Sequence, residues 1–176
     1  IQMAHFTSII ANRGHFYTPH IIKKIGLKDS IPEEYTTLQN TTISPKNFDP
    51  IIEGMADVYR YGTASKPFIG IPGIEICGKT GTAENYIKID GKRMQLTDHS
   101  IFISFAPRND PKIALAVFVE NGYWGSRWAG RIAGLMTEKF LRDSISRKDM
   151  EQFVLNGSLM YEYQKPYSGK AFKINQ

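Results

Sequence analysis

Two apolar segments separated by a short polar link place the strongest constraint on the fold. Residues 100 to 106 and 113 to 119 carry apolar side chains on both of their alternating sets, which is typical of strands that are covered on both faces. The link runs from Pro107 to Pro111 and contains Asn109-Asp110, a composition typical of a turn. We therefore predict two adjacent antiparallel strands, each buried on both faces.

A helix that could cover these strands is predicted from about Ser126 to Arg147. Its small residues would allow close approach to a sheet, and its large apolar residues recur at helical spacing. The small residues are Ala129, Gly130, Ala133 and Gly134, and the apolar stripe is Trp128, Ile132, Leu135, Met136 and Phe140. The charged residues at its end, Arg142, Arg147 and Lys148, are expected to be solvated and favourable to the helix dipole.

Two further helices are predicted in the first half. One begins at Asp49-Pro50, with Asp49 as the N-cap and the proline in the first turn, and ends at Gly62. The other has an apolar helical pattern and stops at Gly14, but Ile1 offers no N-cap. We therefore expect that the sequence begins inside a helix and that an earlier part of the protein precedes it. The expected fold class is α+β (mixed α/β), an antiparallel sheet covered by helices.

Composition limits the classes of function. The chain has 176 residues with 41% hydrophobic and 22% charged residues, which suits one folded domain and excludes collagen, coiled coil and a disordered tail. A formal charge of +5 favours anionic partners. A single cysteine, Cys77, excludes an intrachain disulfide, and the four histidines form no metal-binding pair. We predict no metal site and no cofactor.

The segment from Ile74 to Cys77 alternates like a short strand and runs directly into Gly78-Lys79-Thr80-Gly81-Thr82. Together with Gly73, the residues Gly78-Lys79-Thr80 match the spacing of a nucleotide phosphate loop. The β-branched residues within that spacing and Gly81 directly after Thr80 disfavour the tight loop and the helix that phosphate binding requires.

The alternative is a strand that binds a carboxylate. The Lys79 ammonium and the hydroxyls of Thr80 and Thr82 can hold a peptide carboxylate by charge-assisted hydrogen bonds, each worth about 1.5–3 kcal/mol. Gly81 lacks a Cβ where a substrate backbone would lie, and an extended peptide could dock along the strand edge. A backbone N–H near Thr82 could serve an oxyanion hole. We predict Lys79 and Thr80 as catalytic residues and Lys79, Thr80, Gly81 and Thr82 as substrate-binding residues.

A resemblance to a known family extends beyond these four residues. The matching segments are the opening helix, 61–64, 76–84, 98–107 and 110–122, which together run from Ile1 to about Leu141. They resemble the C-terminal half of the transpeptidase domain of class B penicillin-binding proteins, closest to the penicillin-binding protein 2 type, in which Lys-Thr-Gly is the third signature. Glu84 stands where that family often has glutamine. We divide the chain into residues 1–149, the C-terminal portion of that domain, and 150–176, an unassigned tail.

The resemblance implies a peptidoglycan D,D-transpeptidase that cross-links stem peptides ending in D-Ala-D-Ala through a serine acyl-enzyme and binds β-lactams. It also implies the extracytoplasmic face of the bacterial inner membrane, an anchor outside this chain, and a glycosyltransferase or elongation-complex partner. No Ser-x-x-Lys and no Ser-x-Asn occurs in the sequence, so we expect this chain to be inactive alone. We further expect exposed apolar surface and self-association.

Other readings stay open. A D,D-carboxypeptidase, a β-lactamase or a β-lactam sensor would share the lysine motif, and a non-catalytic basic module could bind nucleic acid or cell-wall polymer, although no ordered nucleic-acid motif is present. Cys77 is interpreted as a small core residue and His99 as a surface or capping residue. Tyr123, Trp124 and Trp128 could line a substrate groove, but core packing is the more common role of such aromatic residues.

Overall fold

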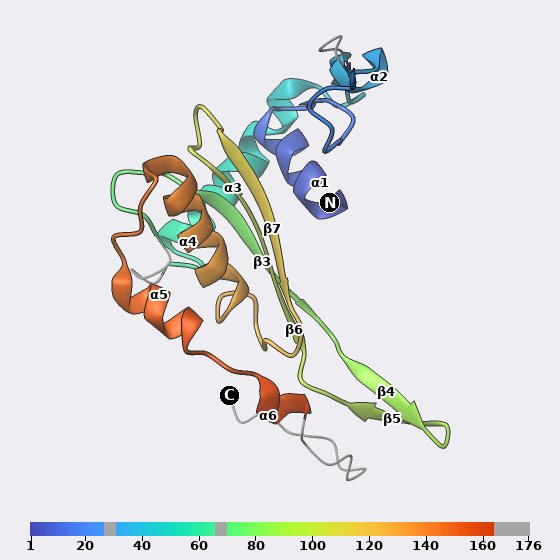
Figure 1. Ribbon diagram of the computed structural model, residues 1–176, viewed down its shortest axis with the longest axis vertical. Coiled ribbons are helices and arrows are strands. Elements are labelled where there is room, and N and C mark those ends of the chain that lie inside the picture. The colour runs from blue at the N-terminus through green and yellow to red at the C-terminus, as the bar shows by residue number, and fades with distance from the viewer. Residues whose placement is uncertain (27–30, 66–69, 164–176) are drawn as a thin grey trace.

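The computed structural model describes residues 1–26, 31–65 and 70–163 (Figure 1). Its helices are α1 (Gln2–Ala11), α2 (Glu33–Thr36), the 3-10 turn η2 (Pro45–Asn47), α3 (Asp49–Arg60), α4 (Ala129–Arg142), α5 (Lys148–Leu155) and α6 (Met160–Tyr163). Its strands are β1 (His15–Phe16), β2 (Gln39–Asn40), β3 (Cys77–Ala83), β4 (Tyr86–Ile89), β5 (Lys92–Gln95), β6 (His99–Ala106) and β7 (Ile113–Val119). Within these ranges no helix is both long and apolar enough to cross a bilayer.

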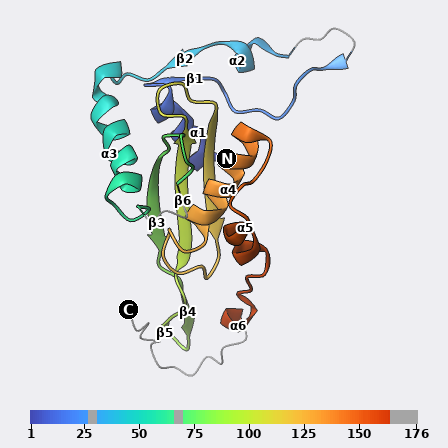
Figure 2. The same cartoon turned by 90° about the vertical axis from the view of Figure 1, so that its left-hand side faces the viewer.

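The main sheet has three antiparallel strands in the order β3-β6-β7. β6 pairs with β7 from Ser100 opposite Val119 to Ala106 opposite Ile113, which confirms the two adjacent antiparallel strands. Figure 2 shows α3 and α4 on opposite sides of this sheet. Phe102 on β6 packs with α4, whereas Phe105 on the alternate face packs with α1 and α3. The α+β class predicted from the sequence is confirmed.

The prediction that both central strands are buried on both faces is right for β6 and wrong for β7. β6 lies between two strands and is buried along most of its length. β7 has one neighbouring strand among the described residues, and the side chain of Phe118 is 55% exposed. Hydrophobicity alone does not distinguish the two strands, because position in the sheet decides how much of each is covered.

Helix α4 is shorter than predicted, but its small residues face the sheet as the sequence predicts. It ends at Arg142 because Asp143 adopts a left-handed conformation with φ 54°. Ala129, Gly130 and Ala133 are buried against the sheet, whereas Met136 and Phe140 are exposed. The contact is therefore made by the small residues, which allow close approach, and part of the predicted apolar stripe faces outward.

The residues after α4 correct the expectation of a solvated basic end. Lys148 is exposed and pairs with Glu151, but Arg147 is largely buried, and its Nε donates to Oε2 of the buried Glu138 at 2.8 Å. The backbone N–H of Ser146 donates to Oε1 of Glu138 at 3.1 Å. Burial alone would raise the pKa of Glu138, but hydrogen bonds from Ser146 and Arg147 outweigh it and hold that pKa below its ordinary value.

Two smaller features complete the framework. The Asp90-Gly91 turn joins β4 and β5 with positive φ at both residues, as a two-residue hairpin requires. Helix α3 begins where predicted, but Phe48 occupies the N-cap position and makes no side-chain cap. Asp49 instead lies in the first turn and pairs with Arg13 of the segment after α1 at 2.8 Å, so it serves tertiary contact rather than capping.

Candidate substrate-binding strand

The lysine motif lies within a strand, not at the end of one. The strand predicted from Ile74 to Cys77 is right at Cys77 and wrong for the three residues before it, where a turn at Pro72-Gly73 closes with a bridge between Ile71 and Ile74. Regular pairing starts at Cys77 and continues to Ala83 in antiparallel register with β6. β3 is an edge strand of the main sheet in the described part of the chain. Its second edge is therefore open to pairing with an extended ligand.

This extended conformation excludes the phosphate-loop interpretation. Such a loop curls its N–H groups around phosphate and then starts a helix. Here Gly78 to Ala83 pair continuously with β6. A Cβ at Gly78 would lie 2.8 Å from the Phe102 ring, so this glycine is required by packing against β6 rather than by a phosphate.

Lys79 presents its ammonium at the surface of β3. It lies opposite Ile103 in the register, and its Nζ donates to the carbonyl of Thr80 at 2.9 Å. One of the three ammonium donors is used in this bond, which leaves two for an incoming anion. The side chain is exposed, so a carboxylate can approach it.

Thr80 is held from a second element. Its Oγ1 lies 2.9 Å from Oγ1 of Thr63, which belongs to the turn after α3. Strand alternation places Thr80 on the face opposite to that of Lys79, the face to which Phe102 contributes. The four predicted site residues are thus brought together on one edge strand but alternate between its faces.

The loop between β7 and α4 packs against Gly81 through Gly125. A Cβ on Gly125 would lie 2.4 Å from the carbonyl of Ile101 and 2.8 Å from the carbonyl of Gly81. The backbone of this loop therefore rests directly on the backbone of β3 and β6. Ser100 fixes the loop further, since its Oγ donates to the Trp124 carbonyl at 3.0 Å. Thr82, the last of the predicted site residues, is exposed.

The aromatic residues of this loop divide into two roles. Trp128 is buried and stacks on Phe153 of α5, with ring centroids 5.1 Å apart, which confirms core packing for that residue. Trp124 is 52% exposed. Cζ of Arg127 lies 4.2 Å from the centroid of the Tyr123 ring and 5.3 Å from that of Trp124, so the three side chains form an aromatic and cationic cluster in the loop before α4.

Cys77 and His99 have the structural roles predicted for them. Cys77 is fully buried in the cluster of α1 and α3, and burial raises the pKa of its thiol to about 12, which makes it unsuited to nucleophilic attack. Nδ1 of His99 accepts a hydrogen bond from the backbone of Asn121 at 3.1 Å, and its ring lies 5.1 Å from that of Phe118. Both residues support the sheet that carries the lysine motif.

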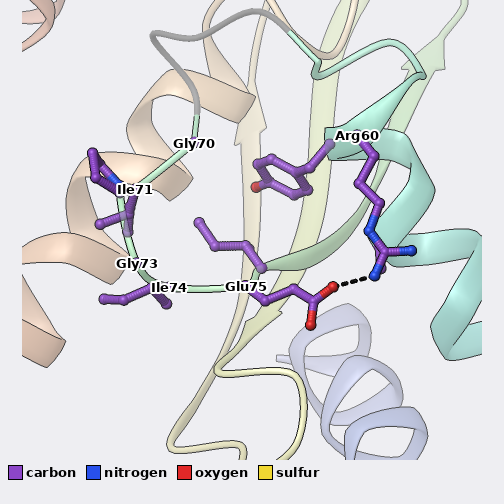
Figure 3. Close-up of a pocket in the computed structure, with 10 residues that line it drawn as sticks. Arg60, Gly70, Ile71, Gly73, Ile74 and Glu75 are labelled. Atoms are coloured by element: carbon purple, nitrogen blue, oxygen red, sulfur yellow. Dashed lines mark hydrogen bonds and ion pairs between the residues drawn. The ribbon is translucent and has the colours of Figure 1, made fainter.

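A cavity of about 640 Å³ lies between α3 and the segment that leads into β3 (Figure 3). Its wall is formed by Tyr59 and the 70–76 segment, and the ion pair of Arg60 with Glu75 lies at one side (Figure 3). This cavity contains none of the predicted site residues. Thr63 was also absent from the sequence prediction, because only the fold brings the turn after α3 to the hydroxyl of Thr80.

The fold and the lysine strand agree with one known family. The model of the penicillin-binding protein transpeptidase domain matches residues 1–142. The chain belongs to this family.

Curated relatives include the peptidoglycan D,D-transpeptidase MrdA of Acinetobacter baumannii, 32% identical over 94% of this chain and 26% of the relative. Stage V sporulation protein D of Bacillus subtilis is 30% identical over 82% of this chain and 22% of the relative. The chain thus spans about a quarter of the length of these relatives.

Solved structures of the family are also similar. Penicillin-binding protein 2 of Pseudomonas aeruginosa, in complex with WCK 5153, is 31% identical with a TM-score of 0.64 over 94% of this chain and 32% of that one. Penicillin-binding protein A of Mycobacterium tuberculosis, as an imipenem acyl-enzyme complex, is 29% identical with a TM-score of 0.62 over 79% of this chain and 30% of that one.

Proposed function

We propose that this chain contributes the carboxylate-binding strand of a peptidoglycan D,D-transpeptidase that forms a serine acyl-enzyme and binds β-lactams. One observation carries the proposal: in a chain of the transpeptidase family, Lys79 stands exposed on an edge strand. An ammonium beside an open strand edge suits an extended peptide that ends in a carboxylate.

In the proposed reaction the nucleophilic serine comes from residues outside this sequence. It attacks the carbonyl of the D-Ala-D-Ala bond, D-alanine leaves, and the amine of a second stem peptide releases the acyl group. Lys79, Thr80 and Thr82 bind the terminal carboxylate, and the backbone N–H near Thr82 stabilises the oxyanion. Lys79 and Thr80 are the residues proposed to act in catalysis, and Gly81 lets the peptide backbone approach.

The proposal extends to place and partners. The Acinetobacter relative is a peptidoglycan D,D-transpeptidase, which supports a site of action on the extracytoplasmic face of the inner membrane. We propose further that a glycosyltransferase or elongation-complex protein is its partner, that the isolated chain self-associates, and that the transpeptidase domain ends at residue 149.

The test is the intact mass of the full-length gene product after exposure to benzylpenicillin. We expect one covalent adduct, formed roughly 10- to 100-fold more slowly in Lys79→Ala, since a charge-assisted hydrogen bond is worth about 1.5–3 kcal/mol. Lys88→Ala, which removes an exposed lysine of β4, is the matched control and should react like the wild type. The 176-residue chain should form no adduct.

If the folded full-length protein forms no adduct, the acyl-transferase proposal is wrong. A basic binding module would then be the remaining candidate, and a steep loss of polymer binding with added salt would support it. The fate of the adduct separates the related enzymes: rapid hydrolysis indicates a β-lactamase, and a persistent adduct indicates a penicillin-binding protein or sensor.

A further inference from the structure

Thr63 lies in a turn whose backbone is fixed on both sides. The N–H of Gly62 donates to the carbonyl of Asp57 at 2.9 Å, and the N–H of Ala64 donates to that of Val58 at 3.0 Å. A Cβ at Gly62 would lie 2.8 Å from Cα of Val58, so the turn requires this glycine. Ala64 is 1% exposed and belongs to the cluster that joins the turn to β6 and α4. Thr63 therefore projects from a rigid support.

The partner hydroxyl is equally fixed. Thr80 pairs with Phe102 in the centre of the β3–β6 ladder, and the two Oγ1 atoms lie 2.9 Å apart. Either hydroxyl can be the donor in this bond, because each has one proton and two lone pairs. The two hydroxyls are thus held in place before a ligand binds, but the hydrogen bond between them can run in either direction.

A bound carboxylate sets the direction. A carboxylate only accepts hydrogen bonds, so Thr80 must give it its single proton. Thr63 is then the donor within the pair. The chain of bonds runs from the Thr63 hydroxyl to Thr80 Oγ1 and from the Thr80 hydroxyl to the carboxylate, and each bond in such a chain polarises the next.

We propose that Thr63 is a positioning residue for substrate binding: its hydroxyl donates to Thr80 Oγ1 and so commits the Thr80 proton to the substrate carboxylate. This inference rests on the proposed function, since it requires that Thr80 meets a carboxylate. It adds a residue from a separate segment, 17 positions before Thr80, to the substrate-binding strand.

The test compares two substrates in the full-length gene product. The acylation rate is measured with benzylpenicillin, which has a free carboxylate, and with its methyl ester, which has none. Thr63→Val removes the hydroxyl and keeps the shape of the side chain. We expect a roughly fivefold to tenfold loss with the acid, mainly in the binding constant, and a change of less than about twofold with the ester. Thr63→Ser, which restores a hydroxyl, should recover most of the loss.

A surface variant provides the matched control. Thr37 directly follows α2, and its hydroxyl donates to the carbonyl of Glu33 in that helix. Thr37→Val removes this hydroxyl and should leave both rates unchanged. If Thr63→Val slows the acid and the ester equally, its role is general stability of the strand and the proposal is wrong. An unchanged acid rate also overturns it. A wild-type protein that reacts with neither substrate overturns the proposed function itself, and with it the carboxylate that Thr63 would serve.

Discussion

Two arginine–carboxylate clusters border the segment that leads into β3, and they differ in exposure. The exposed cluster joins Arg60 and Arg108 to Glu53 and Glu75, and its side chains are between 23% and 46% exposed. Figure 3 shows its Arg60–Glu75 pair beside the 70–76 segment. The buried cluster consists of Glu138, Ser146 and Arg147, with Glu138 fully buried and Arg147 13% exposed.

The difference in exposure gives the clusters different roles. Water and salt screen the exposed pairs, so each contributes little to stability. The buried carboxylate of Glu138 is not solvated by water and depends on its protein partners. One of them, Arg147, also donates to the Gly134 carbonyl at 2.7 Å and to the Gly70 carbonyl at 2.9 Å. Arg147 therefore connects α4 to the start of the segment before β3. This connection depends on the carboxylate of Glu138, which balances the charge of Arg147.

The largest effect is expected from Glu138→Gln. The change keeps the size of the side chain but removes the negative charge that faces the guanidinium of Arg147. Removal of one partner of a buried pair costs about 3–5 kcal/mol, and the partial exposure of Arg147 places the expected loss near 3 kcal/mol. Chemical denaturation of the full-length protein, followed by near-UV circular dichroism, measures it. Glu151→Gln, which affects the exposed pair with Lys148, is the control, and an equal loss in both variants would contradict the comparison.

A smaller loss of stability is expected when the pH is lowered. The pKa values of Glu138, Glu53 and Glu75 all lie below their ordinary value of 4.5 in the folded protein. The unfolded chain therefore binds more protons in this range, and stability is present above about pH 5 and is lost as pH falls through the folded pKa values. We expect a lower unfolding midpoint at pH 4 than at pH 7. The drop should be smaller in Glu138→Gln, and the same drop in both proteins would show that Glu138 is not linked.

Within the exposed cluster, Glu75→Gln should cost less than about 1 kcal/mol. Arg60 retains Glu53 as a partner, and Arg108 does so too, so neither guanidinium is left alone. The same denaturation experiment measures the change. A loss as large as that of Glu138→Gln would mean that the segment before β3 is held mainly by the exposed cluster.

The smallest expected effect is a difference between the two clusters in how their contribution to stability depends on salt. Between 0.1 M and 1 M NaCl the Debye length falls from about 10 Å to 3 Å. We expect the small effect of Glu75→Gln to disappear in 1 M NaCl and the effect of Glu138→Gln to remain, measured as the difference in unfolding midpoint from the wild type. Disappearance of both would place Glu138 in contact with solvent.

Local sequence signals predicted which helices and strands surround the site better than they predicted how far the side chains of those elements are buried. The β6–β7 pair and α3 follow from patterns within a few residues, and the structure confirms them. Phe118 has an apolar side chain and yet lies exposed on β7, because neighbours distant in sequence decide coverage.

The candidate site shows the same division. Lys79 to Thr82 were found from adjacent residue types. The contribution of Thr63 could not be found in this way, because its hydroxyl meets Thr80 only after the α3 turn folds against β3.

The sequence by itself determined the class of fold and the β6–β7 pair, since alternation, helical spacing and turn residues act over short distances. Tertiary structure decided which charges are buried, which strands lie at an edge and which hydroxyl orients Thr80. Those properties depend on contacts between segments far apart in the chain, such as Arg147 with Gly70, and the energy of a charge or a hydroxyl is set by what surrounds it.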